Sequence, residues 1–166
     1  MLLETHDVSK AFGGFVALAE ASLAVEAGEI VGLIGPNGAG KSTFFNCIAG
    51  DLATSAGRIL FDGVDVTQEP PEARALAGIG RTFQVPATFE DMSILENVMV
   101  GAFLRHRHAR DARAKAVEVL RLTGLDAQAS KPARSLGTPG RKRLEIARVL
   151  ATEPKLLLLD EALAGL

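Results

Sequence analysis

Two short apolar runs without a polar face stand out in the pattern of hydrophobic and polar positions. They are Ile30–Ile34 and Leu156–Leu159, and neither shows the alternation of a half-exposed strand. A strand of a parallel sheet that is covered on both faces has this composition. The pattern therefore predicts two buried strands of a parallel sheet.

The rest of the N-terminal region has the pattern of strands separated by turns. Ser22–Glu26 alternates between apolar and polar residues, and Ala27-Gly28-Glu29 follows it as a turn. Arg58–Phe61 ends at Asp62-Gly63, a pair that is typical of a tight turn between strands. We therefore expect strands on both sides of the first apolar run.

From about residue 85 to residue 151 the pattern becomes helical. Val117 and Leu120 fall near the spacing of one helix face, with charged residues opposite them. The glycines and proline of residues 137–140 break this region ahead of a further helix, predicted over roughly 141–151. The order of strand, loop, helix, helical insert and strand predicts an α/β core with an inserted helical part.

Composition narrows the class of protein. The chain has 166 residues, which allow one domain, and 48% of them are apolar, too many for a disordered chain. Its 18 basic and 20 acidic residues give a net charge of −2, so nucleic acid is not an expected partner. The single cysteine, Cys47, excludes a disulfide framework. No apolar run approaches the roughly 20 residues that span a bilayer, and the N-terminus lacks the pattern of a signal peptide, so we expect a cytosolic protein.

A glycine-rich loop follows the first apolar run and has the most specific chemistry in the chain. Residues 35–42 fit the pattern G-x-x-x-x-G-K-[S/T] in full, between a predicted strand and a helix predicted from about Lys41 to Ala49. Glycines let successive backbone N–H groups point at phosphate oxygens, and a helix N-terminus favours an anion. We expect Lys41 to bind the β- and γ-phosphates and Ser42 to coordinate Mg²⁺. The predicted nucleotide-binding residues of this phosphate loop are Gly35, Pro36, Asn37, Gly38, Ala39, Gly40, Lys41, Ser42 and Thr43.

Two acidic residues, Asp160 and Glu161, follow the second apolar run. Acidic residues at the carboxyl end of a parallel strand lie beside the ligand crevice of an open α/β sheet. We expect Asp160 to hold Mg²⁺ through the outer shell and Glu161 to polarise the attacking water. The alternative is a pair of acids that cap the N-terminus of a helix.

With these two motifs in place, the whole chain resembles the nucleotide-binding domain of an ABC transporter. The resemblance implies that Phe12, in Ser9–Gly14, stacks on adenine, and that Gln84, in Gly80–Gln84, contacts Mg²⁺ and the attacking water. The alternative for Phe12 is a packing role. ATP and Mg²⁺ are the implied cofactors, the implied catalytic residues are Lys41, Gln84 and Glu161, and the implied metal-binding residues are Ser42, Gln84 and Asp160.

The segment Leu136–Leu144 aligns with the signature loop of this family, L-S-G-G-Q, and with the helix that follows it. In the family this loop caps the γ-phosphate of ATP held by a second subunit, and the implied contacts come from Leu136, Gly137, Thr138 and Gly140. The match is degenerate because Thr138 and Pro139 stand in place of the two glycines, and proline has no backbone N–H to donate. The alternative is a helix N-terminus that only packs.

The resemblance also implies an architecture: an α/β fold with a P-loop NTPase (RecA-like) core, an antiparallel β subdomain and an inserted helical subdomain. A single ATP-binding domain is expected over residues 1–166, with the β subdomain and P-loop core in 1–84, the helical subdomain in 85–151 and the strand of the Walker B acids in 152–166. Family members continue beyond these acids into further strands and a switch histidine. With the C-terminal strands missing, a truncated domain that binds Mg·ATP and hydrolyses it barely is expected.

Three stretches narrow the resemblance to the ATP-binding subunits for branched-chain (hydrophobic) amino acid uptake: Gly80–Gln84, Asp91–Ala102 and Arg143–Arg148. This implies an ATPase that pairs with a second ATP-binding subunit, identical or different, and with transmembrane permease subunits on the inner face of the plasma membrane. The permease is expected to contact the helical insert near Gln84 to Glu96, and the ATPase has no direct contact with the transported solute.

Several alternatives stay open. Importers of urea or small aromatic acids share much of the same sequence, and a soluble ABC ATPase without a transport role or a fragment that binds nucleotide without hydrolysis has the same motifs. A P-loop GTPase or kinase is disfavoured because no N-K-x-D stretch reads the base. The basic run Arg105–Lys115 is interpreted as a solvated surface, with a transporter loop or anionic headgroups as alternative partners.

Overall fold

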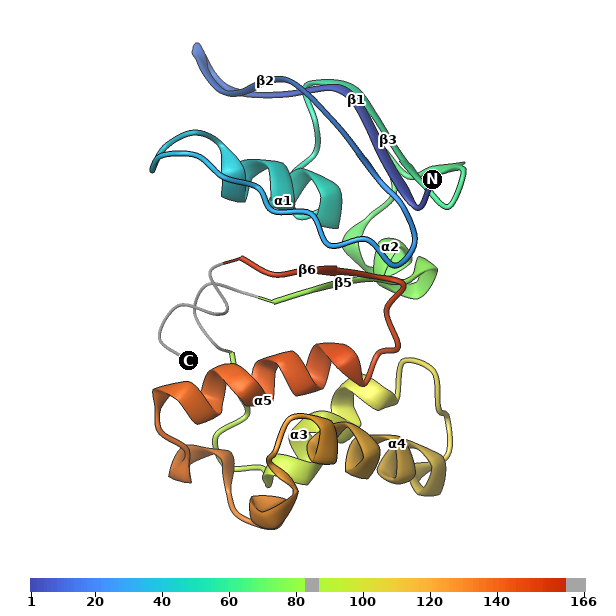
Figure 1. The fold of residues 1–166 in the computed structure, drawn as a ribbon, viewed down its shortest axis with the longest axis vertical. Coiled ribbons are helices and arrows are strands. Elements are labelled where there is room, and N and C mark those ends of the chain that lie inside the picture. The colour runs from blue at the N-terminus through green and yellow to red at the C-terminus, as the bar shows by residue number, and fades with distance from the viewer. Residues whose placement is uncertain (83–86, 161–166) are drawn as a thin grey trace. The chain divides into compact units, whose positions relative to one another are not determined.

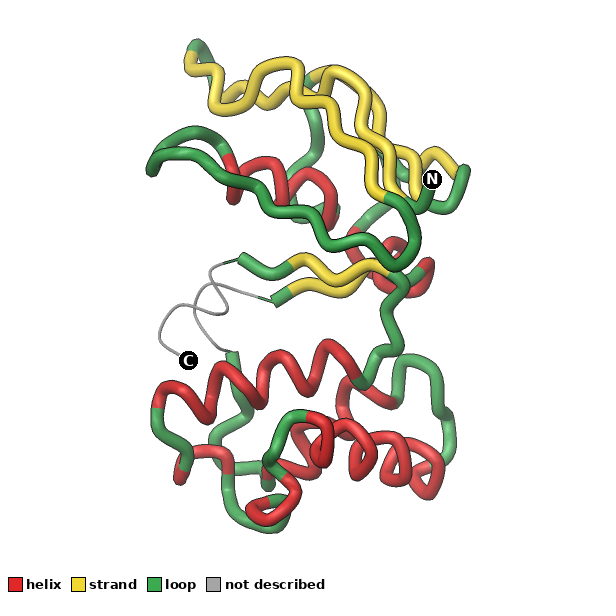
Figure 2. Tube along the Cα trace, viewed as in Figure 1, coloured by secondary structure: helices red, strands yellow, loops and turns green. Residues whose placement is uncertain are grey.

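A computed structural model describes residues 1–82 and 87–160, and residues 83–86 and 161–166 lie outside the described part. The chain forms two compact units, Met1–Ala77 and Gly78–Leu166 (Figure 1). Most strand residues belong to the first unit, whereas the second unit consists mainly of helices (Figure 2). The division into residues 1–84, 85–151 and 152–166 stays a prediction.

The first unit is built on a four-stranded antiparallel sheet in the order β2-β1-β3-β4. Its strands are β1 (Leu3–Phe12), β2 (Phe15–Val25), β3 (Ala56–Phe61) and β4 (Val64–Asp65). β1 and β2 form a long hairpin, with Leu3 opposite Val25 at one end and Phe12 opposite Phe15 beside the turn. The strands predicted at residues 22–26 and 58–61 are confirmed within β2 and β3.

Register shifts interrupt the ladder between β1 and β2, and two of its residues have a left-handed backbone. Asp7 has φ 50° and Glu20 has φ 48°, a conformation that costs a residue with a Cβ roughly 1–2 kcal/mol. Two serines stabilise these positions. The Asp7 N–H donates to Ser22 Oγ at 2.9 Å, and the Glu20 N–H donates to Ser9 Oγ at 2.9 Å.

Helix α1 (Lys41–Ala49) begins and ends where the sequence predicts. It starts at Gly40, with φ 86°, and stops at Gly50, with φ 89°, and glycine adopts this left-handed backbone without a steric cost. The helix runs beside the sheet of the first unit (Figure 1). The most buried core residues of this unit are Phe44, Cys47 and Ile48 from α1 and Leu3, Val8, Ile59 and Phe61 from the strands.

The strand predicted at Ile30–Ile34 is wrong, because these residues form no strand. Ile30 is 99% exposed and Ile34 is 94% exposed. A strand exists only through hydrogen bonds with a neighbouring strand, and no other described residue pairs with this run. An apolar composition makes a segment suitable for a sheet, but it does not supply the partner.

A short helix that the sequence did not predict, α2 (Pro71–Ala77), closes the first unit. Proline suits the first turn of a helix, where its missing N–H has no partner to lose. The helix buries Arg74, which is 2% exposed, and exposes Leu76 at 55%. This reversal of the usual hydrophobic pattern explains why periodicity alone did not reveal the helix.

The second unit contains two parallel strands, β5 (Ile79–Arg81) and β6 (Leu156–Leu158), and the helices α3 (Ile94–Ala102), α4 (Ala109–Leu122) and α5 (Thr138–Leu150). Two 3₁₀ turns, η1 (Asp126–Gln128) and η2 (Ala133–Ser135), join α4 to α5. The strand predicted at residues 156–159 is confirmed, but the expected burial on both faces is not. Only Leu158 of this strand is buried, since β5 is the one described strand that pairs with β6.

The predicted helical region is confirmed, and its three long helices share one apolar core. At Gly101 in α3, any side chain would collide with the backbone carbonyl of Arg148 in α5, so glycine permits the two helices to cross closely. The central residues of this core are Ile94, Val98 and Ala102 from α3, Ala112, Ala116, Val119 and Leu120 from α4, and Leu144 and Ala147 from α5.

Helix α5 begins three residues before the predicted start at Arg141. The sequence cluster at residues 137–140 was expected to precede the helix, but Thr138, Pro139 and Gly140 form its first turn, and Gly137 is the N-cap. Proline breaks the interior of a helix but not its first turn, which is the physical reason for the difference. Within the described residues, no helix is long and apolar enough to cross a membrane.

Candidate functional site

The phosphate loop turns directly into helix α1. Gly38 and Gly40 have φ 83° and 86°, values that residues with a Cβ rarely adopt, and the Ala39 N–H donates to the Pro36 carbonyl at 3.2 Å. Because Gly40 is the N-cap and has no side chain, it leaves the first N–H groups of α1 uncapped. The positive end of the helix dipole adds to these donors. The loop therefore has the backbone of an anion site.

Lys41 lies at the first position of α1, and its ammonium group is bound by the loop itself. Lys41 Nζ donates to the carbonyl of Gly35 at 2.6 Å and to the carbonyl of Pro36 at 2.8 Å. An ammonium group has three hydrogens, so one donor remains for an anion while its charge stays over the loop. Ser42 is exposed in the same turn, where its hydroxyl is open to a ligand.

Phe12 lies beside the turn of the β1–β2 hairpin and is 48% exposed. The ammonium group of Lys10 lies 5.1 Å from the centre of the Phe12 ring, close enough for a cation–π contact. Lys10 Nζ also donates to the Ala53 carbonyl at 2.7 Å, which fixes the ammonium group against the loop ahead of β3. Lys10 is a residue that the sequence did not single out. The ring thus has a defined cation beside it and retains exposed surface.

The hairpin and the phosphate loop meet at Gly40. A Cβ placed on Gly40 would lie only 2.6 Å from the carbonyl oxygen of Ala17 in β2. Phe15, the residue opposite Phe12, is two positions from Ala17, or about 7 Å along a strand. The first unit therefore brings Phe12 and residues 35–43 to the same end of the hairpin.

Asp160 follows the carboxyl end of β6 and is 8% exposed. β5 runs parallel to β6, with Arg81 opposite Leu158, and the Thr82 N–H donates to the Leu158 carbonyl at 3.0 Å. The predicted site residues Gln84 and Glu161 come two residues after Thr82 and one residue after Asp160. Gln84 and Glu161 lie outside the described part of the chain. The parallel pair of strands brings Thr82 and Asp160 to the same edge of the sheet.

The predicted signature residues form the N-terminal turn of α5. Leu136 is buried, Gly137, Thr138 and Pro139 are exposed, and Gly140 packs so closely that a Cβ there would lie 3.0 Å from Leu136. Two ion pairs fix the surrounding segments: Arg141 to Glu90 at 2.7 Å and Arg134 to Asp91 at 2.8 Å. The exposed turn is thus held in place by side chains on either side.

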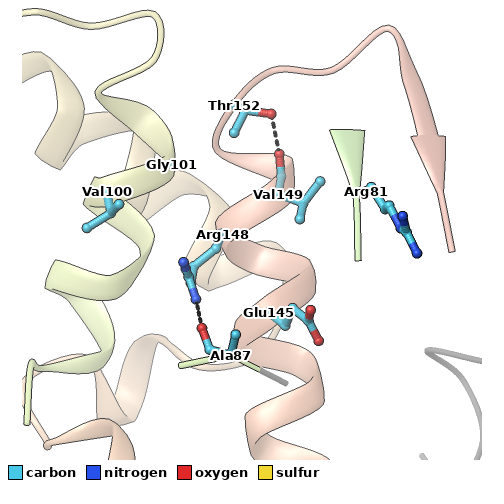
Figure 3. Close-up of a pocket in the computed structure, with 8 residues that line it drawn as sticks. All are labelled: Arg81, Ala87, Val100, Gly101, Glu145, Arg148, Val149 and Thr152. Carbon is cyan, nitrogen blue, oxygen red and sulfur yellow. Dashed lines mark hydrogen bonds between the residues drawn. The ribbon is translucent and has the colours of Figure 1, made fainter. Parts of the chain in front are cut away.

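A cavity of about 160 Å³ lies in the second unit between β5, α3 and α5 (Figure 3). Arg148 donates to the Ala87 carbonyl at one wall, and its guanidinium lies 4.7 Å from the Phe89 ring. Burial lowers the pKa of Arg148 from its ordinary value. The residues that line the cavity are Arg81, Ala87, Val100, Gly101, Glu145, Arg148, Val149 and Thr152.

A buried amide holds the segment beyond this cavity. Asn97 in α3 is fully buried; its Oδ1 accepts from the Phe89 N–H at 2.9 Å, and its Nδ2 donates to the Phe89 carbonyl at 3.0 Å. Nδ2 also donates to the Ser93 carbonyl at 2.9 Å. The chain that emerges at Ala87 is therefore bound to the helical core by side chains that the sequence did not single out.

A magnesium ion is the metal that the phosphate loop implies, and the donor set suits it. Among residues 1–82 and 87–160, no three His, Cys, Asp or Glu side chains gather as a protein cage. Mg²⁺ typically takes one or two protein oxygens and fills its other positions with phosphate and water. The Ser42 hydroxyl in the first unit and the Asp160 carboxylate in the second are, each by itself, oxygen donors of the kind it takes.

The phosphate loop ahead of α1 and the α/β folding of both units define a P-loop nucleotide-binding protein. The model of the ABC transporter family matches residues 18–164. The chain therefore belongs to the ABC transporter family, as one of its ATP-binding domains, and the members of this family are ATPases. The sequence-based assignment of family and fold is confirmed.

Two relatives and two solved structures set the scale of the similarity. The sulfate/thiosulfate import ATP-binding protein CysA of Bordetella pertussis is 42% identical over all of this chain and 47% of its own length. The probable branched-chain amino acid transport ATP-binding protein LivG of Archaeoglobus fulgidus is 36% identical over 99% of this chain and 68% of its own length. The chain thus spans about half the length of the CysA relatives.

Both solved structures cover 99% of this chain with a TM-score of 0.87. One is the ADP conformation of MJ1267, an ATP-binding cassette of an ABC transporter, at 34% identity and 70% of its own chain. The other is a dimeric post-hydrolysis state of the cassette MJ0796 bound to ADP and Pi, at 26% identity and 75% of its own chain. These likenesses confirm the mixed α/β cassette fold.

Proposed function

We propose that this chain is the ATP-binding part of an ABC importer subunit, which binds Mg·ATP at residues 35–43 and hydrolyses it. The observation that supports this most is the phosphate loop itself. Gly38 and Gly40 have left-handed backbones, the N-terminus of α1 is uncapped, and Lys41 places an ammonium group over the loop. These are the features that bind a polyphosphate.

Each predicted site residue has a role in this proposal. Phe12 stacks on adenine, because an exposed ring at the hairpin turn offers an apolar face to the base. Lys41 and the N–H groups of residues 38–43 bind the β- and γ-phosphates. Ser42 and Gln84 would contact Mg²⁺ and Asp160 would hold it through the outer shell; the ion, when bound, neutralises charge on the phosphates. Glu161 orients the water that attacks the γ-phosphate.

The proposed contact with a second subunit is made by the N-terminal turn of α5. We propose that Leu136, Gly137, Thr138 and Gly140 of one subunit contact the nucleotide held by another. In this turn Thr138 is exposed, so its hydroxyl is accessible, and Pro139 occupies a position whose N–H has no partner within the helix. The dimeric cassette MJ0796 is a relative in which two such chains meet.

The proposed permease contact lies near residues 84–96, a range of which Ala87 lines the cavity of the second unit. Val100 is 41% exposed at this cavity and Phe89 is 45% exposed. An apolar surface rimmed by arginines fits a short amphipathic segment of a membrane subunit. By this route the protein binds the inner face of the plasma membrane from the cytoplasm without contacting the solute.

The proposed solute is a branched-chain or related amino acid. Its support is the similarity of Gly80–Gln84, Asp91–Ala102 and Arg143–Arg148 to that group of importers, together with the LivG relative. Sulfate or thiosulfate is the second candidate, because the CysA relative is 42% identical. Uptake of radiolabelled leucine and of sulfate, measured in cells that lack the gene and in complemented cells, separates the two.

Binding and turnover of ATP test the core of the proposal. Titration calorimetry of the protein with Mg·ATP is expected to give a Kd in the range of about 1 μM to 1 mM, as is usual for enzyme substrates. Phosphate release, assayed with the protein and its permease in vesicles, tests turnover in the assembled transporter. A protein that is folded by circular dichroism but does not bind ATP would contradict the proposal.

A further inference from the structure

Arg74, on helix α2, is a buried cation whose hydrogen bonds all end on backbone carbonyls. Its Nη1 donates to Cys47 at 2.6 Å and to Ile48 at 2.8 Å, its Nη2 donates to Thr67 at 2.9 Å, and its Nε donates to Glu69 at 2.9 Å. Burial lowers the pKa of Arg74, and the negative charges of Glu69, Asp51 and Asp65 partly offset this effect. Since burying a charge is costly, the four carbonyls add to the compensation for the lost water.

Two of these carbonyls lie at the C-terminal end of α1, the helix that starts from the phosphate loop. The last four carbonyls of a helix have no partner within it. In α1 the Asn46 carbonyl accepts from the Leu52 N–H at 3.1 Å. The Cys47 carbonyl accepts from the Gly50 N–H at 3.3 Å as well as from Arg74, and the Ile48 carbonyl accepts from Arg74. A cation at this end also complements the negative end of the helix dipole. Arg74 therefore holds the end of α1 opposite to the phosphate loop.

Gly50 is the residue that lets Arg74 come so close. It ends α1 with φ 89°, and a Cβ placed on it would lie 3.0 Å from Arg74 Nε and 3.2 Å from the backbone nitrogen of Pro71. A side chain at position 50 would therefore require the guanidinium to shift by a few tenths of an ångström. Gly50 and Arg74 thus form one joint between α1 and α2.

A displacement at this joint is transmitted to the phosphate loop, because α1 is a short helix that moves as one piece. Nine residues of helix span about 13.5 Å, so a tilt of roughly five degrees at one end displaces the other end by about 1 Å. Displacements of this size reduce the binding and reaction of oriented groups strongly. The first turn of α1 presents Lys41, Ser42 and the N–H donors, all of which move with the helix.

We propose that Arg74 is a positioning residue for the nucleotide: through the carbonyls of Cys47 and Ile48 it fixes the direction of α1, and with it the phosphate loop. The inference rests on the proposed function, in which residues 35–43 bind Mg·ATP. Arg74 itself does not touch the nucleotide. It acts on affinity through α1, and the effect is separate from its contribution to folding.

The test compares Arg74→Met with Val8→Ala, a buried substitution in the same unit that leaves the Arg74 hydrogen bonds in place. Both variants lose stability, and both are measured at a temperature where circular dichroism shows them folded. Arg74→Met is expected to weaken Mg·ATP binding about tenfold by calorimetry, and Val8→Ala less than twofold. Equal affinities for the two variants would overturn the inference.

Two further variants keep the test decisive if Arg74→Met does not fold. Arg74→Lys retains the charge but cannot reach four carbonyls at once, so its affinity is expected between those of Arg74→Met and the parent. Gly50→Ala keeps the arginine but displaces it, and is expected to weaken ATP binding as Arg74→Met does. Full affinity in both variants would overturn the inference. A parent protein that does not bind ATP refutes the proposed function instead.

Discussion

The phosphate loop shows how much chemistry single residues contribute at the scale of the side chain. Two of the three hydrogens of the Lys41 ammonium group are bound by the carbonyls of Gly35 and Pro36. The charge is thereby held over the loop instead of moving freely in solvent. In the proposed role, this preorganises Lys41 for a phosphate, and its removal should affect binding more than stability.

Lys41→Ala should reduce the affinity for Mg·ATP about a hundredfold or more, because a charge-assisted contact is lost. The side chain covers little of the core, so thermal unfolding should hardly change. Lys131→Ala, an exposed lysine in the second unit, is the matched control and should bind ATP like the parent. Equal calorimetric affinities for the parent and Lys41→Ala would refute the assignment of the loop.

Phe12→Ala should weaken the binding of ATP, GTP and CTP by a similar factor. Stacking of a base on an aromatic ring contributes about 1–3 kcal/mol and reads no base edge. Phe15→Ala is the control, because Phe15 lies opposite Phe12 in the hairpin and is also exposed. If the two variants bind all three nucleotides equally well, the base meets another side chain.

At the scale of elements, the N-terminus of α3 is fixed by a capping box. The Glu96 N–H donates to Ser93 Oγ at 3.1 Å, and the Ser93 N–H and hydroxyl donate to the Glu96 carboxylate at 2.8 and 2.7 Å. These bonds, that of the Ser93 side chain above all, lower the pKa of Glu96 below its usual value of 4.5. The ionised form is therefore the one that stabilises the fold.

The capping box predicts a pH dependence of stability. The contribution of Glu96 should be complete above its ordinary pKa and should be lost as the pH falls through its lowered pKa. Glu96→Gln should then be less stable than the parent at pH 7 in urea unfolding, and the difference should shrink as the pH falls through the lowered pKa of Glu96. Ser93→Ala should lose about 1 kcal/mol at pH 7. A difference between the parent and Glu96→Gln that is constant with pH would contradict this account.

The elements also show which parts of the fold are encoded locally. Helix α1 was predictable to the residue, because glycines with left-handed backbones set both of its ends. Helix α5 starts three residues earlier than expected, because the first turn tolerates Pro139. The run Ile30–Ile34 was not predictable as a loop, since its conformation depends on pairing with distant chain and not on its own composition.

The same distinction applies to the candidate site. The phosphate loop, Phe12 and Asp160 were proposed from motifs, because their neighbours in sequence are part of the chemistry proposed for them. Arg74 was not, because its partners lie 26 and 27 residues away at the end of α1. The sequence around Arg74 gives one local sign of its proposed role: an arginine stands among alanines in a short helix, near an exposed leucine.

At the scale of the whole molecule, the exposed run Ile30–Ile34 should govern self-association. Exposed apolar residues with unpaired backbone are a template for contact with other chains. The double variant Ile30→Lys, Ile34→Lys should therefore remain monomeric to a higher concentration than the parent in light scattering. Leu122→Lys, at a 74% exposed leucine on α4, is the control and should associate as the parent does. Association that is insensitive to the double variant would locate the contact elsewhere.

The left-handed backbone of Glu20 marks a position where one substitution should increase the stability of the protein. Asparagine tolerates this conformation better than glutamate, so Glu20→Asn should gain up to about 1 kcal/mol and raise the melting temperature by a few degrees. Glu20→Gln, which keeps the strain, should melt like the parent, and a gain shared by both variants would point to charge instead. One substitution in the hairpin should thus stabilise the protein by relieving backbone strain, without changing Phe12 or the phosphate loop.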